Sequence, residues 1–210
     1  MATDPKKTLD AYQAKRGEFR ILEIPAMQYL MIDGAGDPNT APAYSDAVAA
    51  LFPLAYTLKF ESRKSLGVDT VVMPLEGLWH APDMESFTSR RDKSAWLWTL
   101  MILVPDHVTP EMFADAVEAV TQKSAKKKLA TPALRSVRLE TLDEGLCVQT
   151  LHVGSYDDEA PVLDDLHQRF IPESGLRMTG LHHEIYLSDV RRVEPAKLRT
   201  ILRQPVERVG

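Results

Sequence analysis

The sequence is poor in cysteine and in long apolar runs. Cys147 is the single cysteine in 210 residues, which excludes an internal disulfide and fits a reducing compartment. We expect Cys147 to be a small buried apolar residue rather than a nucleophile. The longest apolar run, residues 97–105, is too short to span a bilayer, and the residues after Met1 lack the apolar stretch of a signal peptide. These absences predict a cytoplasmic protein with no membrane partner.

The chain also lacks an excess of basic residues. Its formal net charge is -5 at pH 7, whereas binding of nucleic acid requires a basic surface. The run of lysines within residues 123–128 is expected to end a helix in solvent, where cations complement the helix dipole. With 44% hydrophobic and 26% charged residues, the composition is that of an ordinary globular protein. We therefore expect no nucleic-acid partner.

Motifs for metals and cofactors are missing as well. His182 and Glu184 could ligate a metal, but no third ligand stands at a recognisable spacing. The glycines in Gly34-Ala35-Gly36 are not followed by the third glycine of a dinucleotide-binding loop. The sequence therefore predicts neither a metal site nor a cofactor.

Apolar periodicity predicts an alternation of strands and helices. Strands are expected at residues 19–32, 71–79, 96–104, 146–153, 181–187 and 197–204. Helices are expected at residues 41–58, 110–124 and 160–170, with a short helix around residues 9–15. Pro53 should kink or divide the first long helix. A charged loop is expected at residues 83–93.

An internal repeat organises these elements. Residues 41–46 align without gaps onto residues 160–165, and each segment follows a strand that closes on Gly36 or Gly154. Two further strands follow each helix, which predicts an α+β fold of two β-α-β-β modules in tandem. We place the modules at about residues 19–106 and 135–207, joined by the helix at 110–124, within a single domain. Two such modules would pair about a pseudo-twofold axis and enclose a ligand groove where they meet.

The strand at residues 181–187 carries the sharpest candidate site. Alternation in a strand puts His182, Glu184 and Tyr186 on one face. A carboxylate beside a phenol, facing aromatic rings, is typical of a pocket for a cationic or electron-poor small molecule. A surface ion pair is the alternative for Glu184. If the carboxylate is buried, it needs a partner, and it could also act as a general base on water.

Aromatic residues upstream could complete that pocket. Trp79 ends a strand just after Gly77, and a glycine there allows another group to approach closely. Trp96 and Trp98 share one face of the next strand, and Tyr56 lies late in the first long helix. Core packing is the alternative explanation for each tryptophan.

Several segments together resemble the GyrI-like small-molecule-binding proteins. They are residues 19–25, 32–39, 55–60, 73–79, 184–189 and 198–206. The most specific of them is the run Pro74-Leu75-Glu76-Gly77-Leu78-Trp79. The likeness covers nearly the whole chain, and it is to the stand-alone branch of the family, without a fused DNA-binding domain.

The resemblance implies tandem modules of the SHS2 type, as in the ligand domains of multidrug-sensing regulators. Such domains bind lipophilic, often cationic molecules against a glutamate, and Glu184 stands at the matching position with Tyr186 beside it. Some stand-alone members are similar to hydrolases that open cyclopropane rings of DNA-alkylating natural products. One departure is His80, which stands where a second aromatic residue is expected after the tryptophan. The candidate ligand-binding residues are Tyr56, Trp79, Trp98, His182, Glu184 and Tyr186.

Three functions are compatible with these residues. The first is binding of a lipophilic, cationic or electrophilic small molecule. The second is a detoxifying hydrolase in which Glu184 and Tyr186 are catalytic. The third is a protein-interaction inhibitor of the gyrase type, with which the acidic balance is compatible. Binding is common to the first two functions.

Overall fold

The computed structural model describes residues 3–80, 93–127 and 132–210. Its helices are α1 (Pro5–Thr8), α2 (Pro42–Glu61), α3 (Pro110–Lys126), α4 (Ala160–Asp164) and α5 (Ile171–Glu173). Its strands are β1 (Arg20–Ile24), β2 (Met27–Ala35), β3 (Glu76–His80), β4 (Leu97–Leu103), β5 (Arg138–Leu142), β6 (Gly145–Val153), β7 (Leu176–Met178), β8 (His182–Tyr186) and β9 (Arg199–Arg208). A π-helical turn, Asp165–Phe170, joins α4 to α5. None of the helices in these ranges is long and apolar enough to cross a membrane.

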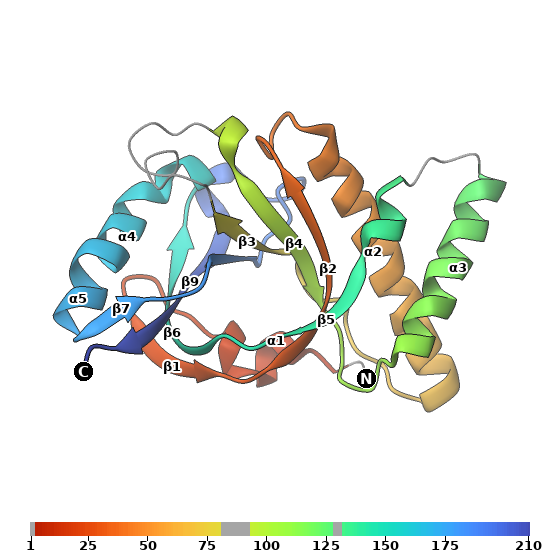
Figure 1. Cartoon of the computed structure of the whole chain (residues 1–210), viewed down its shortest axis with the longest axis horizontal. Helices are drawn as coiled ribbons and strands as arrows, with labels where there is room; N and C mark the ends of the chain where they lie inside the picture. The colour runs from red at the N-terminus through yellow and green to blue at the C-terminus, as the bar shows by residue number, and fades with distance from the viewer. Residues whose placement is uncertain (1–2, 81–92, 128–131) are drawn as a thin grey trace.

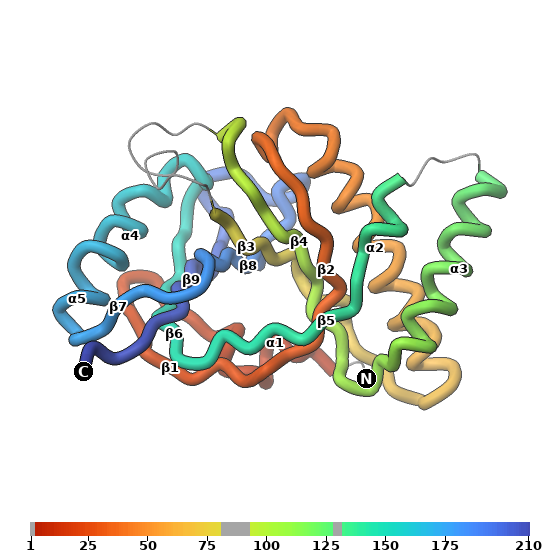
Figure 2. Tube along the Cα trace, in the orientation of Figure 1, coloured from red at the N-terminus to blue at the C-terminus, as the bar shows by residue number. Residues whose placement is uncertain are grey.

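The strands form one curled antiparallel sheet (Figure 1). Its strand order is β1-β6-β9-β8-β3-β4-β2-β5, and β7 pairs with β9 beside this path. The order is symmetric about the β8–β3 pair, because β6-β9-β8 on one side mirrors β2-β4-β3 on the other. This arrangement confirms the predicted α+β fold of two β-α-β-β modules, which lie side by side in Figure 2.

Equivalent hydrogen bonds fix which residues correspond in the two modules. The Gly36 N–H donates to the Trp96 carbonyl over 2.8 Å, and the Gly154 N–H donates to the Leu198 carbonyl over 3.0 Å. Gly36 therefore corresponds to Gly154, and Trp96 corresponds to Leu198.

The same register extends to the central strands. Two residues further along, Trp98 of β4 corresponds to Thr200 of β9. Trp79 pairs with Trp98, and Tyr186 pairs with Thr200. Trp79 and Tyr186 are therefore equivalent positions on the two strands that meet at the pseudo-twofold axis.

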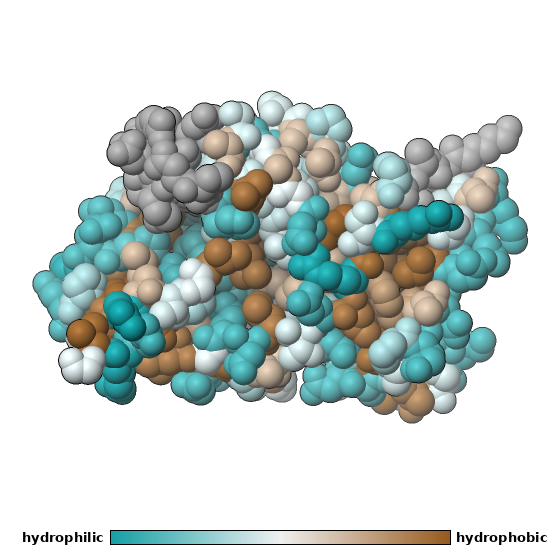
Figure 3. Space-filling view, in the orientation of Figure 1, coloured by the Kyte–Doolittle hydropathy of each residue, from teal (hydrophilic) through white to brown (hydrophobic). Residues whose placement is uncertain are grey.

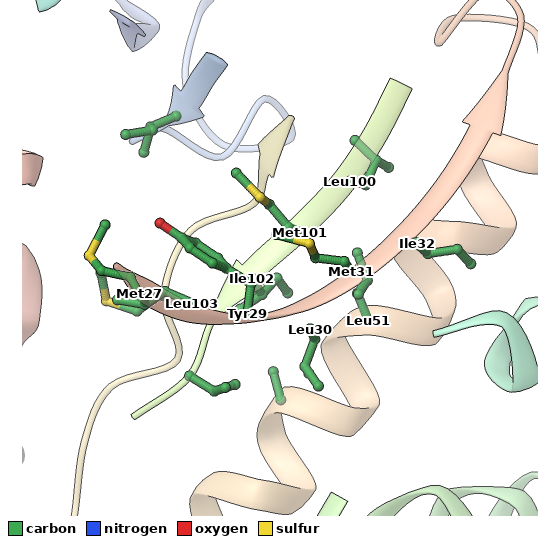
Figure 4. Close-up of a cluster of buried hydrophobic side chains, with 14 of the residues drawn as sticks. Met27, Tyr29, Leu30, Met31, Ile32, Leu51, Leu100, Met101, Ile102 and Leu103 are labelled. Carbon is green, nitrogen blue, oxygen red and sulfur yellow. The ribbon is translucent and has the colours of Figure 1, made fainter. Parts of the chain in front are cut away.

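Helices cover one face of the sheet in both modules. Leu30 of β2 packs with Leu51 of α2, whereas Tyr29 and Met31 lie on the opposite side of β2 together with Met101 (Figure 4). α3 packs against α2 rather than on the sheet (Figure 1), and its outer surface is hydrophilic (Figure 3). The alternation of β2 thus separates a face under helices from a second, inner face.

The inner face holds a buried polar network. His183 lies between two carboxylates, with its Nε2 atom 3.0 Å from Glu76 and its Nδ1 atom 3.0 Å from Glu144. Arg203 donates to the second oxygen of Glu144 over 2.7 Å. From the N-terminal segment, Tyr12 donates to Glu76 over 2.5 Å, and the Ala11 carbonyl accepts from Arg203. The segment before β1 is thereby fastened over this face.

Several predicted elements differ from the structure. The single strand expected at residues 19–32 is two strands, β1 and β2, which break at Pro25 and pair with different partners. The strand expected at residues 71–79 is confined to β3. The helix expected at residues 9–15 is a 3-10 turn, Asp10–Tyr12. Pro53 lies inside α2 without dividing it.

Other predictions concern single residues or segments. Cys147 is fully buried as predicted, and burial raises the pKa of its thiol to about 12. Strand β5, at the edge of the sheet, was not predicted, and its side chains are intermediate or exposed without a regular alternation. The charged loop predicted at residues 83–93 lies almost wholly outside the described residues.

Candidate ligand site between the two modules

The site lies where β3 and β8 pair at the centre of the sheet. Gly77 is directly opposite Glu184 in this pair. Leu30 packs with α2, and its equivalent Val148 packs with Leu166 and Ile171 of the second module's helix. The helices of both modules therefore cover the same face, on either side of β3 and β8.

A chain of hydrogen bonds crosses the module boundary at this point. Trp79 Nε1 donates to the Tyr186 hydroxyl over 2.9 Å, and that hydroxyl donates to Glu184 Oε2 over 2.8 Å. Burial and the Glu184 charge raise the pKa of Tyr186 well above its ordinary value, so the phenol stays protonated and remains a donor. The chain fixes the orientation of the Glu184 carboxylate.

Gly77 makes room for this chain. A Cβ atom at position 77 would lie 2.8 Å from Trp79 Nε1 and 3.3 Å from the Tyr186 hydroxyl oxygen. The first distance is too short for any side chain to be accommodated without movement of the indole. This close approach is the one that the sequence predicted from a glycine at the end of the strand.

Aromatic rings of the first module surround Trp79. Tyr44, in the first turn of α2, stacks on Trp79 at a centroid distance of 6.4 Å and meets Trp98 edge-on at 5.4 Å. Trp96 meets Trp79 edge-on at 5.6 Å. Trp98 is 1% exposed and donates to the Gly36 carbonyl over 3.2 Å, so it forms the buried part of this aromatic cluster.

The second module contributes polar groups instead. Tyr156 meets Tyr186 edge-on at a centroid distance of 5.5 Å. One helical turn later, Glu159 is 4% exposed and directly precedes α4. Burial, and next the Glu184 charge, raise the pKa of Glu159 to about 10, so this carboxyl is neutral at physiological pH. The second module therefore adds to the site a buried carboxyl that carries no charge at physiological pH.

His182 lies on the same strand face as Glu184. Its Nε2 atom is 3.5 Å from Glu184 Oε1, and its ring meets that of His167 edge-on at a centroid distance of 5.8 Å. Burial, followed by the proximity of His182, lowers the pKa of His167 to about 4. His167 is therefore neutral and adds no positive charge to the site.

Five of the six predicted ligand-binding residues lie together here: Trp79, Trp98, His182, Glu184 and Tyr186. Tyr56 does not lie with them. Its side chain is 49% exposed on the outer side of α2 and stacks with Phe60 instead. The helix buries Leu51, Leu54 and Leu58 against the sheet, and this rotation directs Tyr56 toward solvent.

Three residues of the site were not predicted as ligand-binding: Tyr44, Tyr156 and Glu159. All three lie at or just before the first turn of a helix that opens with Ala-Pro. The internal repeat contained the signal, because a twofold axis brings the starts of both helices to the module junction. Trp96 was noted on the face of Trp98 but was likewise not predicted to bind a ligand.

The chemistry available to the site is that of carboxylates and phenols. Glu184 can accept a hydrogen bond or a proton, and Tyr186 can donate one. No cluster of three or more His, Cys, Asp or Glu side chains suited to a metal ion occurs in the described part of the chain.

His80, at the end of β3, points to the inner face together with Glu76 because it is an even number of residues away. It therefore lies across the strand from the face that carries Trp79.

Comparison with known proteins gives matches over nearly the whole chain. The family described as "GyrI-like small molecule binding domain" matches residues 17–207. A solved structure of an uncharacterised conserved protein from Listeria innocua is 39% identical, with a TM-score of 0.85 over 97% of this chain and 99% of that one. A structure described as a hydrolase from Listeria innocua is 38% identical, with a TM-score of 0.82 over 97% of this chain and 99% of that one.

A more distant match shares the fold alone. The C-terminal domain of EcmrR is 14% identical, with a TM-score of 0.55 over 91% of this chain and 98% of that one. Among curated proteins no match was found.

Proposed function

The chain belongs to the GyrI-like small-molecule-binding family, and on that basis we propose that it binds a lipophilic cation against Glu184. The observation that carries this proposal is the setting of the Glu184 carboxylate. Its side chain is 13% exposed; the Tyr186 hydroxyl donates a hydrogen bond to it, and the His182 ring lies 3.5 Å away without making one. A carboxylate removed from water is stabilised by an opposite charge, which the side chains beside Glu184 do not supply in full.

The aromatic cluster suits the rest of such a ligand. Trp79, Trp96 and Tyr44 present ring faces and edges within one cluster next to the carboxylate. Cations are attracted to the faces of aromatic rings, and apolar ligand surface gains free energy by leaving water. A flat aromatic cation would satisfy the charge of Glu184 and the rings together.

A second candidate function is hydrolysis of an electrophile. The bond from Tyr186 to Glu184 favours it, because a general base and a proton donor stand side by side. A 38% identical protein, matched over 99% of its chain, is described as a hydrolase. In this reaction Glu184 would take a proton from water while the water oxygen attacks the electrophilic carbon of a strained cyclopropane ring, and a C–C bond of that ring would break. Tyr186 would donate to the centre that gains electrons.

A titration with product analysis separates the two functions. Tryptophan fluorescence would be followed while lipophilic aromatic cations and one cyclopropane-bearing alkylator are added, and each ligand would be checked afterwards by mass spectrometry. Saturable quenching with unchanged ligands supports binding. A water adduct formed by the wild type but not by Glu184→Gln supports hydrolysis.

The matched control is Glu61→Gln, which removes an exposed carboxylate from α2. Glu184→Gln should weaken cation binding by at least tenfold with the melting temperature nearly unchanged, and Glu61→Gln should change neither. Equal affinities of wild type and Glu184→Gln would contradict the proposal.

A further inference from the structure

Buried polar atoms without partners gather on the second-module side of the site. Glu159 Oε1, Thr200 Oγ1 and both ring nitrogens of His182 are buried and have no hydrogen-bond partner among the described residues. Most buried polar atoms in native proteins are paired, so each exception needs an explanation. All three side chains lie around Glu184. Glu159 is near enough for the Glu184 charge to affect its pKa, His182 lies 3.5 Å from Glu184, and Thr200 pairs with Tyr186 on the adjacent strand.

The comparison of the two modules shows that this side differs from the other. Thr200 occupies the position that Trp98 occupies in the first module. Trp98 fills its position with an indole that rests against Gly34, where a Cβ atom would lie 2.0 Å from the ring. Thr200 is a far smaller side chain, and Glu159 lies buried next to it. The first-module half of the site is therefore aromatic, whereas the second-module half also carries polar groups that can accept hydrogen bonds.

We propose that Glu159 is a second acidic group of the site, and that the site takes an aromatic cation bearing N–H donors, which binds in exchange for the Glu159 proton. This inference rests on the proposed function and specifies its ligand class. The aromatic body lies against the rings of the first module. The charged N–H group lies between Glu184 and Glu159, with the Thr200 hydroxyl as a further acceptor.

The unpaired acceptors distinguish two kinds of cation. A quaternary cation has charge but no N–H, so it would leave Glu159 Oε1 without a partner. A protonated amine or an amidinium-like group donates several hydrogen bonds and satisfies those atoms. Leaving a buried polar atom unpaired carries a large penalty, so the site should prefer the donor-bearing cation.

The charges around Glu159 explain the exchange of a proton. Burial, then Glu184 on β8 and Asp157 in the preceding turn, disfavour a negative charge at Glu159, whereas the nearby Thr200 hydroxyl and Lys93 favour it. Lys93 is held 3.1 Å from Asp157, which offsets its effect. Tyr156, Tyr186 and Tyr44, which also line the site, are neutral because burial raises the pKa of each phenol. A bound cation supplies the missing positive charge, so Glu159 ionises and its proton leaves to solvent.

The test is calorimetry with two probes that share an acridine ring. 9-Aminoacridine is a flat cation with N–H donors, and N-methylacridinium is a flat cation without them. Titrations at pH 7.5 in two buffers of different ionisation enthalpy count the protons released. We expect 9-aminoacridine to bind at least tenfold more tightly than N-methylacridinium, with release of close to one proton per ligand bound. Its affinity should rise with pH between 6.5 and 8.5.

Variants assign the proton to Glu159. Glu159→Gln should abolish both the proton release and the pH dependence, and it should reduce the preference for 9-aminoacridine. Asp164→Asn, which removes an exposed carboxylate from the neighbouring α4, should behave as the wild type. Thr200→Val, which retains the shape and removes the hydroxyl, should reduce the preference without removing the proton release.

The outcomes decide between the two proposals. Binding of 9-aminoacridine by the wild type without net proton release overturns the inference and leaves the proposed function in place. This proton count needs no variant, so it is decisive even where Glu159→Gln is poorly folded. Retention of the proton release in a folded Glu159→Gln also overturns the inference. Failure of the wild type to bind either acridine overturns the inference together with the proposed cation binding.

Discussion

Trp79 and Tyr186 occupy equivalent positions in the two modules, and the indole of the one donates a hydrogen bond of 2.9 Å to the hydroxyl of the other. The pseudo-twofold axis thus runs through a bond between two different side chains. Because Tyr186 in turn donates to Glu184 over 2.8 Å, the first module orients the carboxylate of the second. The site depends on both modules, although its acidic groups come from one.

The two tyrosines of α2 should behave differently. Tyr44→Ala removes the ring that stacks on Trp79, so ligand affinity should fall by about tenfold, as expected for loss of an aromatic contact worth roughly 1 to 2 kcal/mol. Tyr56→Ala alters an exposed side chain three helical turns away, or about 18 Å along α2, and should leave affinity unchanged. Titration of both variants with the same aromatic cation measures this. Equal losses would mean that Tyr56 belongs to the site after all.

Two glycines should tolerate alanine to different degrees. At Gly77 the new methyl group meets the end of the Trp79 indole at 2.8 Å, so Gly77→Ala should displace that ring at a cost of about 1 to 2 kcal/mol in unfolding free energy. At Gly34 it would lie 2.0 Å from the enclosed Trp98 ring, so Gly34→Ala should cost about 3 kcal/mol or more.

Urea unfolding measures both glycine variants, and near-ultraviolet circular dichroism reports the tryptophan environments. Gly77→Ala should also weaken ligand binding, because it disturbs the bond that orients Tyr186. Wild-type affinity in Gly77→Ala would show that the Trp79–Tyr186 bond is not needed for binding.

The inner-face network should make stability depend on pH in the acid range. Burial alone would raise the pKa of Glu144, but His183 and Arg203 outweigh it and hold this pKa at about 2, below the ordinary 4.5. The folded state binds this proton less readily than the unfolded state. The resulting stabilisation is present above pH 4.5 and is lost as the pH falls toward 2. It amounts to about 3 kcal/mol by linkage.

The test of this network is Glu144→Gln. At neutral pH the substitution should cost about 3 to 5 kcal/mol, because it leaves buried cations without their partner. Between pH 4.5 and 2 the variant should lose less stability than the wild type. Urea unfolding at pH 7 and pH 3 measures both effects. Asp165→Asn, at an exposed ion pair with Arg169, is the control and should change little. If the unfolding free energies of wild type and Glu144→Gln fall equally between pH 7 and pH 3, Glu144 is not the cause of the loss of stability in acid.

His183 should make folding stability fall as the pH rises, which is the opposite of the effect of Glu144. Burial would lower the pKa of its imidazole, but Glu144 and Glu76 raise it above the ordinary 6.5. Its contribution is therefore complete below pH 6.5 and declines as the pH rises through the raised pKa. His183→Gln should remove this decline, which unfolding measurements between pH 6 and 10 would detect. If the stability of His183→Gln still declines with pH as that of the wild type does, another group causes the decline.

Tyr12→Phe should loosen the N-terminal segment. The substitution removes the hydroxyl that donates to Glu76 over 2.5 Å, a bond to a buried carboxylate. The expected cost is about 2 kcal/mol, as for hydrogen bonds to charged groups. Limited proteolysis should then cleave before residue 19 faster than in the wild type, while ligand affinity stays the same. Unchanged cleavage would mean that Arg203 and its bond to the Ala11 carbonyl suffice to hold the segment.

Much of the architecture could be predicted because the determinants are local. Proline at the start of α2 and of α4, and glycine just after the strand that precedes each of them, mark the same β-α-β-β order twice. The split at Pro25 was missed because the apolar pattern continues across it, and only the choice of partner strands separates β1 from β2. Strand β5 was missed because its partner, β2, is distant in the sequence.

The site could be predicted where one strand carried the information. The alternation of His182, Glu184 and Tyr186 follows from strand geometry, so these residues were placed on one face correctly. Glu159 could not be found in this way, because the groups that act on its carboxyl, Glu184 of β8 and Thr200 of β9, are distant in the sequence. Tyr56 was predicted in place of Tyr44 because the apolar periodicity of α2 does not define closely enough how the helix is rotated over the sheet.

The alternation of β3 and β8 has a consequence for how such a protein can change over evolutionary time. Residues 77, 79, 184 and 186 point to the ligand side, and their neighbours Glu76 and His183 point to the network that holds the fold together. Substitutions at one set leave the other set in place. Descendants of this chain could therefore acquire new ligands by altering every second residue, while inheriting the same folded scaffold.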